Sequence, residues 1–432
     1  MTARNLIQFA YTSEWALAKF FAALFEDGVS DIFTLMTICG VSEKDKNSVL
    51  ERLVRELGDR QKALKTGQDW RFTNILTEIR SITYLIDRLR KDKLNYFPLN
   101  RNENPINIPD GDYEAVVFTK NPTHIDYIET LLRADHNIVC EKPLVIVTNE
   151  FHIADRTQLD RLEDIVDKTN SNGTVHMDAE HYSAKRATIT FYERIGEMIM
   201  QYGRISKIEA HTLEKDDPNK ARTKNLLSIE NRTGLLLDMG VHLFGIISNI
   251  GGKISETSKA AYDIYPGNPK TEDYRKCEAY DVETYVETEF KIKGSFFHNN
   301  ANGNFTIAKF IDRFEGAERN PKDSKQFRVT FKSEEGGGET VVTLDFNEGT
   351  VTASDGRSWS PNPYLRISTN EYNNILRNLN RAIQNGEQPI TNFQNSIRNL
   401  NTIHRCYNQF PVYNSFSKIN KETQILKYKR KW

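Results

Sequence analysis

The fold of this chain is decided by the stretch Ile138-Val-Cys-Glu-Lys-Pro-Leu-Val145. Its first three residues are small or β-branched and apolar, which is typical of the end of a buried strand. Pro143 has no backbone N–H, so sheet pairing ends directly after Lys142. A lysine in this position lies at the carboxyl edge of a sheet, where open α/β sheets bind their ligands. The alternative is a solvated Glu-Lys pair at an ordinary strand end.

Chain length and charge set broad limits. With 432 residues, the chain is long enough for two or three domains. Its 58 basic and 59 acidic residues give a formal net charge of −1. This balance gives no electrostatic reason to expect a nucleic acid or an anionic membrane as a partner.

Cysteine usage and hydropathy favour a cytoplasmic protein. The four cysteines form no CxxC pair, which argues against a zinc site or a disulfide framework. The N-terminus lacks a basic stretch followed by a long apolar core, and no run of 18 apolar residues occurs. We therefore expect reduced thiols, no metal and no membrane partner.

The first forty residues predict the start of a parallel sheet. Asn5–Ala10 and Ile32–Cys39 have the composition of buried strands, and Glu14–Phe25 has the apolar spacing of an amphipathic helix. A strand–helix–strand order of this kind is typical of parallel sheets. The same pattern continues with expected strands at Glu114–Thr119 and Asn137–Cys140.

The turn after the first strand carries no dinucleotide fingerprint. Residues 10–16 contain no glycine, although glycines normally let the backbone approach a pyrophosphate there. Tyr11 and Glu14 add bulk and negative charge at that place. No acidic residue follows the second strand to hold an adenosine ribose, but Ser42 and Lys44 would suit a 2′-phosphate.

Residues 43–112 are long for a single crossover between strands. We interpret 43–95 as mainly helical, with an insertion and a short strand near Trp70–Thr73, and 99–112 as a loop. A helix at Arg156–Lys168 and a strand at Thr174–Asp178 complete this part of the chain.

From about residue 180 the pattern changes. Helices are expected at Ala184–Tyr202 and Thr233–Ile250, around a strand at Ser206–Thr212. Long alternating runs then predict antiparallel strands of one large sheet with a solvated face, and two helices close the chain. The expected strands are Tyr280–Lys291, Ser295–Asn304, Gln326–Lys332 and Thr340–Asp345, with a hairpin turn at Gly336–Gly338. The expected helices are Asn370–Asn385 and Asn392–Gln409.

The expected helix at Thr233–Ile250 carries a second candidate site. It is apolar nearly all round and should be buried, yet it contains Asp238 and His242. Their i, i+4 spacing places both on one helix face. Burying an unpaired carboxylate costs several kcal/mol, so this face must meet partners or a polar cavity. We interpret His242 as a general acid/base oriented by Asp238, and a structural Asp–His pair is the alternative.

Two further groups lie near the predicted junction of the halves. In His181-Tyr-Ser-Ala-Lys185, Tyr182 and Lys185 could hydrogen-bond a polyol, and a surface helix start is as good an interpretation. His124 follows Asn121-Pro122 and either approaches the same pocket or caps a helix.

Together these motifs resemble the glucose–fructose oxidoreductase/inositol dehydrogenase/MocA family. The resemblance rests on Glu-Lys-Pro at 141–143, Thr-Lys-Asn-Pro-Thr-His at 119–124 and Thr-Gly-Leu-Leu-Leu-Asp-Met-Gly-Val-His at 233–242, and extends over roughly residues 114–410. It implies an α/β N-terminal Rossmann domain and an α+β C-terminal domain with a large open, mostly antiparallel sheet. With it we expect domains at 1–180 and 181–410 and an extension at 411–432.

The resemblance also implies a reaction and a site. The reaction would be hydride transfer between NAD or NADP and a sugar or polyol, in a homodimer or homotetramer formed through the C-terminal sheet. Lys142, Asp238 and His242 would be catalytic, and His181, Tyr182 and Lys185 would help to bind substrate. The cofactor would be bound by Thr12, Ser13, Ser42, Thr119, Asn121, His124, Glu141, Lys142 and Pro143.

The missing glycines depart from the family pattern and leave three interpretations open. The first is an oxidoreductase with an unusual cofactor site. The second is a non-catalytic relative that binds a sugar or nucleotide as a regulator or scaffold. The third is a lyase or hydrolase that acts on glycosides with a tightly held NAD.

Overall fold

A computed structural model describes most of the chain. The described residues are 4–9, 20, 23–24, 29, 32–40, 51, 54–55, 57–59, 61–62, 65–66, 75–90, 95–98, 106–119, 121–149, 153–169, 173–214, 234–263, 283–309, 324–333, 338–362, 367–368 and 370–410. Several predictions lie outside them: most of the helix Glu14–Phe25, the strand at 70–73, most of the turn Gly336–Gly338 and the extension 411–432.

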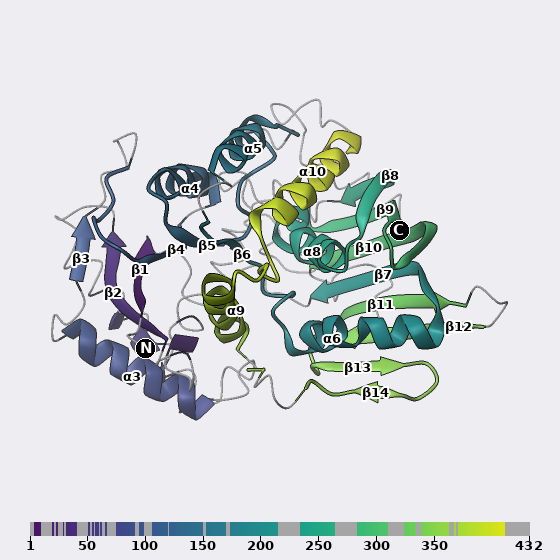
Figure 1. The fold of residues 1–432 in the computed structure, drawn as a ribbon, viewed down its shortest axis with the longest axis horizontal. Coiled ribbons are helices and arrows are strands. Elements are labelled where there is room, and N and C mark those ends of the chain that lie inside the picture. The colour runs from purple at the N-terminus through teal and green to yellow at the C-terminus, as the bar shows by residue number, and fades with distance from the viewer. Residues whose placement is uncertain are drawn as a thin grey trace, which may run out of the picture. The chain divides into compact units, whose positions relative to one another are not determined.

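The chain forms two compact units (Figure 1). Unit 1 comprises Met1–Leu144, Arg161–Lys185 and Arg366–Gln394, and unit 2 comprises Val145–Asp160, Arg186–Leu365 and Asn395–Trp432. The chain passes from one unit to the other at five points. One of them, after Lys185, is near the domain boundary expected after residue 180.

Unit 1 is built on a six-stranded parallel sheet. Its strand order is β3-β2-β1-β4-β5-β6, with all neighbours parallel, which is the order of a doubly wound dinucleotide-binding sheet. This confirms the predicted α/β domain. The strands are β1 (Arg4–Phe9), β2 (Phe33–Gly40), β3 (Asn95–Pro98), β4 (Glu114–Val117), β5 (Asn137–Glu141) and β6 (His176–Ala179).

Strand β3 was not predicted at its observed position. Asn95-Tyr-Phe-Pro98 has no continuous apolar run and ends in proline, and its pairing with β2 is a tertiary contact. The other unit 1 strands lie within a few residues of their predicted positions.

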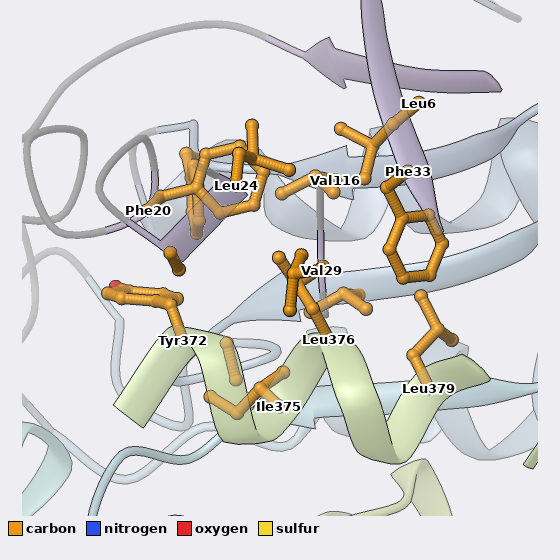
Figure 2. Packing of buried hydrophobic residues seen from close by; sticks show 14 of the residues in the cluster. Leu6, Phe20, Leu24, Val29, Phe33, Val116, Tyr372, Ile375, Leu376 and Leu379 are labelled. Carbon is orange, nitrogen blue, oxygen red and sulfur yellow. The ribbon is translucent and has the colours of Figure 1, made fainter. Parts of the chain in front are cut away.

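Helices flank this sheet, and α9 helps to build its core. The helices are α3 (Ile75–Arg90), the 3₁₀ turn η2 (Asn121–Thr123), α4 (His124–Arg133), α5 (Thr157–Thr169), whose first residues belong to unit 2, and α9 (Glu371–Asn385). Figure 2 shows Tyr372, Leu376 and Leu379 of α9 directed at apolar side chains that include Leu6 and Val116 from β1 and β4. A segment from late in the sequence therefore completes the core of unit 1.

Unit 2 is built on an eight-stranded sheet. Its order is β14-β13-β12-β11-β7-β10-β9-β8, and every pair is antiparallel except β7 with β10. This confirms the large, mostly antiparallel sheet. The strands are β7 (Arg204–Glu214), β8 (Lys253–Asp263), β9 (Tyr285–Lys293), β10 (Phe297–Lys309), β11 (Ser324–Lys332), β12 (Glu339–Asp345), β13 (Thr350–Ala353) and β14 (Ser358–Trp359), of which β8, β13 and β14 were not predicted.

Helices cover one face of this sheet (Figure 1). They are α6 (Arg186–Tyr202), the π-helical turn η4 (Leu236–Gly240), α8 (Val241–Asn249) and α10 (Phe393–Gln409), which begins in unit 1. Central strand β7 shows the resulting alternation, since Ile208, Ala210 and Thr212 are buried and the residues between them are partly exposed.

Within the described residues, no helix is both long enough and apolar enough to cross a membrane.

Candidate active site

The strand order places a topological switch point between β1 and β4. The backbone N–H of Phe118 donates to the carbonyl of Phe9 at 3.1 Å, so the carboxyl ends of these two strands lie side by side. Thr119 follows immediately and is 2% exposed. Open parallel sheets bind ligands outside the carboxyl ends of their strands at such a point.

Gln8 is a buried polar group one residue from the end of β1. Its side chain is 0% exposed, and neither amide atom has a hydrogen-bond partner in the described structure. Leaving such groups unsatisfied costs about 1–3 kcal/mol each. An amide retained here is therefore compatible with a polar ligand at the switch point.

His124 joins the ends of β4 and β5. It is fully buried, and its Nδ1 lies 2.7 Å from the carbonyl of Pro143 and its Nε2 3.0 Å from the carbonyl of Thr119. Burial lowers the pKa of His124, opposed by these two carbonyl contacts and by the charge of Glu141. Both neighbours are acceptors, so a neutral imidazole donates to only one of them, and the carbonyl of Pro143 is the nearer.

The Glu141 carboxylate is held by two donors from distant parts of unit 1. His181 Nε2 lies 2.9 Å from Oε1, and Tyr372 Oη donates to Oε2 at 2.8 Å. Because a carboxylate can only accept, His181 Nε2 must carry the proton. Lys142 follows Glu141 directly and is joined to Pro143 by a cis peptide bond.

Two carboxyl groups near Lys142 have pKa values shifted in opposite directions. Burial alone would raise the pKa of Glu141, but the charge and hydrogen bond of His181, the charge of Lys142 and the Tyr372 hydroxyl together lower it. For Glu180, burial and the charge of Asp178 raise the pKa well above its ordinary value, despite the Ser183 hydrogen bond of 2.9 Å and the charge of Lys142. Two carboxyl groups whose pKa values are shifted apart by their surroundings are frequent at catalytic sites.

The remaining predicted substrate residues of unit 1 interact with each other. Lys185 Nζ lies 4.5 Å from the centre of the Tyr182 ring, a cation–π contact. Tyr182 is 5% exposed, and Lys185 is partly exposed.

In unit 2, Asp238 and His242 lie on the buried helix predicted from the sequence. Asp238 is within η4 and His242 is in α8, and they are 5% and 3% exposed. A π-helical turn inside a helix is frequent at functional sites. Two ionisable side chains at this depth must have polar neighbours, since an isolated buried charge is costly.

A buried carboxylate holds the start of this helix. Glu283 is 0% exposed, and its Oε1 accepts hydrogen bonds from the backbone N–H of Leu236 at 3.0 Å and from Tyr407 Oη at 2.7 Å. Gly234 has a φ of +59°, and a Cβ there would clash with the carboxylate oxygens of Glu283. Glycine is required at this position because any side chain would displace the carboxylate.

The structure links some predicted site residues and leaves others separate. In unit 1, His124 lies between the carbonyls of Thr119 and Pro143, and a hydrogen bond joins Glu141 to His181. Asn121 begins η2, two residues after Thr119. Thr12, Ser13 and Ser42 lie outside the described residues.

The sequence patterns did not indicate three of these residues: Glu180, Glu283 and Tyr372. Glu180 could have been found because it follows a predicted strand, as Lys142 does. Tyr372 reaches Glu141 across 231 residues, which no local pattern reveals. No cluster of His, Cys, Asp or Glu suited to a metal occurs among the described residues.

The fold matches solved structures of dehydrogenases. Levoglucosan dehydrogenase in complex with NADH and levoglucosan is 16% identical with a TM-score of 0.62, covering 94% of this chain and 96% of that one. The fold is that of the glucose–fructose oxidoreductase/inositol dehydrogenase/MocA family. UDP-N-acetylglucosamine 3-dehydrogenase GnnA from Acidithiobacillus ferrooxidans is 10% identical with a TM-score of 0.57, covering 95% and 98% of the two chains. An NAD-binding protein from Listeria innocua is 13% identical with a TM-score of 0.55, covering 95% of each chain.

No family model and no curated protein sequence matches the chain. At such low identities the structural likeness establishes the fold alone.

Proposed function

We propose that the protein is an NAD(P)-dependent oxidoreductase acting on a sugar, a polyol or a sugar derivative. The observation that carries the proposal is the anchored Lys142 turn at the carboxyl edge of a sheet with the dinucleotide-binding strand order. The likeness to dehydrogenases solved with NADH and with sugars supports this choice of reaction.

The described residues fit a dinucleotide at the switch point. The ends of β1 and β4 are adjacent, Thr119 follows β4, and Gln8 offers an amide without a partner among the described residues. NAD or NADP bound there would supply the acceptor or donor of a hydride. Thr12, Ser13 and Ser42 remain proposed cofactor residues, with Thr119, Asn121, His124 and Glu141–Pro143 on the nicotinamide side.

The chain's own groups would handle the proton and the oxygen of the substrate. On oxidation of an alcohol, the carbinol carbon loses its hydrogen with the electron pair, and the hydroxyl proton passes to His242. The Lys142 ammonium would stabilise the negative charge that develops on the oxygen. Asp238 would orient His242 or the substrate, and His181, Tyr182 and Lys185 would contact sugar hydroxyls.

Turnover of single variants tests these roles. Lys142→Ala and His242→Ala should each lower kcat by about 10²–10⁴-fold in an NAD(P)-coupled assay over a panel of sugars and polyols. Their affinities for NADH or NADPH should fall only a little, because neither group holds the cofactor's phosphates and Lys142 would meet only the nicotinamide end. Wild-type turnover in both variants would refute the assignment.

The absence of glycine from residues 10–16 favours a second candidate, a non-catalytic relative that binds a sugar or nucleotide as a regulator. This candidate predicts ligand binding without turnover by the wild-type protein. A lyase or hydrolase with a tightly held NAD is the third candidate. It predicts that denaturing the purified protein releases NAD.

A further inference from the structure

We infer that Tyr372 is a positioning residue: with His181 it clamps the Glu141 carboxylate and thereby fixes the place of Lys142. The inference rests on the proposed catalytic role of Lys142. We use the term carboxylate clamp for Glu141, His181 and Tyr372.

The clamp joins three elements of unit 1. Glu141 ends β5, His181 follows β6, and Tyr372 is in the first turn of α9. The two donor distances of 2.9 and 2.8 Å are ordinary hydrogen-bond lengths. Tyr372 Oη also lies 3.3 Å from His181 Nε2, so all three side chains meet at one point.

The Tyr372 ring is fixed independently of its hydroxyl. It packs edge-on against Phe20 at 6.1 Å, Phe118 at 5.6 Å and His181 at 4.8 Å between ring centres. Figure 2 shows Tyr372 at the start of α9 beside Phe20. Removing only the hydroxyl should therefore leave the ring in place.

The start of α9 is held as well. The Asn370 side chain accepts from the backbone N–H of Tyr372 at 3.1 Å and caps the helix. Asn374 Nδ2 donates at 2.9 Å to the carbonyl of Ala184, three residues after His181. The two donors of the clamp thus come from segments that are themselves hydrogen-bonded to each other.

Lys142 is consequently anchored from both sides. The clamp holds the residue before it, and His124 holds the carbonyl of Pro143 after it at 2.7 Å. A lysine has a long, flexible side chain, so its ammonium is placed reproducibly only where its backbone is fixed. A shift of about 1 Å in a catalytic group can cost about 10²-fold in rate.

Tyr372→Phe tests the clamp, and Tyr113→Phe is the matched control. Tyr113 is also a buried tyrosine of unit 1, at 4% exposed, and its hydroxyl has no hydrogen-bond partner in the described structure. Tyr372→Phe should lower kcat about tenfold or more, because a hydrogen bond to a charged group is lost. The dissociation constant for NADH or NADPH should change less than about twofold, and Tyr113→Phe should match the wild type.

The pH profile separates positioning from a general loss of structure. The groups around Glu141 are His181, Tyr372, Lys142, His124 and Cys140. Removing the Tyr372 hydroxyl takes away one cause that lowers the pKa of Glu141, so that pKa rises. The acid limb of the kcat/KM profile should therefore move to higher pH in Tyr372→Phe and stay in place in Tyr113→Phe.

Hydrogen exchange tests the clamp without any activity. In Tyr372→Phe, the backbone amides of residues 138–146 should exchange several-fold faster than in Tyr113→Phe. Equal exchange in these two variants would overturn the inference, whether or not the protein is an oxidoreductase. Faster exchange in a protein without NAD(P) turnover would uphold the clamp and reject the proposed function. If the wild type turns over substrate and Tyr372→Phe has an unchanged kcat and pH profile, the proposed function is upheld and the clamp is rejected.

Discussion

At the scale of single residues, two glutamates at the ends of neighbouring strands have pKa values shifted in opposite directions. Glu141 follows three buried apolar residues of β5 but meets two donors and a lysine, so its pKa is lowered. Glu180 follows β6, is 4% exposed and lies near Asp178, so burial and a like charge raise its pKa. The local partners, more than the position in the fold, decide the direction of each pKa shift.

The raised pKa of Glu180 predicts a pH-dependent stability. Because the folded protein holds this proton more tightly than the unfolded chain, the stabilisation is complete below the ordinary glutamate pKa. It is lost as the pH rises toward the folded-state value. Glu180→Gln stays neutral at every pH, so its free energy of unfolding should fall less than that of the wild type between pH 5 and pH 8.

Urea denaturation across this range measures the difference. Asp87→Asn, at an exposed carboxylate on α3, is the control and should follow the wild-type curve. A Glu180→Gln curve parallel to the wild type would show that Glu180 is already ionised in the folded protein.

At the scale of elements, the helix formed by η4 and α8 depends on a capped start. Its first N–H groups have no partner within the helix, and Glu283 accepts from one of them at 3.0 Å. A carboxylate at a helix N-terminus is also favoured by the helix dipole. This cap holds the start of the helix that carries Asp238 and His242.

Gly234→Ala should therefore be strongly destabilising. The added Cβ meets the buried Glu283 carboxylate and also occupies a φ of +59°, so we expect a loss of about 2–4 kcal/mol in the free energy of unfolding. Gly251→Ala is the matched control, since Gly251 has a φ of +75° but no atom within 4 Å of its added Cβ. It should cost only the backbone strain, about 1 kcal/mol. Equal losses in the two variants, measured by urea denaturation, would mean that Glu283 moves aside without cost.

Most helices and strands were predictable from the sequence, but several strands were not. Strands β4 and β5 have continuous apolar runs, and the helix at Asp238 has an apolar surface interrupted by two ionisable residues, so local patterns sufficed. Strands β3, β13 and β14 have two to four residues and no continuous apolar run. Their place is decided by pairing with neighbours that lie elsewhere in the sequence.

At the scale of the whole molecule, the division into two units shows what sequence order hides. Residues 366–394 belong to unit 1 although they follow most of unit 2 in the chain. The Glu-Lys-Pro turn was predictable because its residues are consecutive, but its contact with Tyr372 depends on this return of the chain. The homodimer or homotetramer implied by the family resemblance stays a prediction.

Binding of a dinucleotide is the property on which the whole account depends. The strand order, the adjacent ends of β1 and β4 and the anchored Lys142 turn favour such binding, whereas the turn without glycine disfavours it. Fluorescence titration of the purified protein with NADH and with NADPH tests it most directly. We predict saturable binding of at least one of them with a dissociation constant below about 1 mM, the upper end of ordinary enzyme affinities. No binding of either at millimolar concentration would contradict the proposed oxidoreductase.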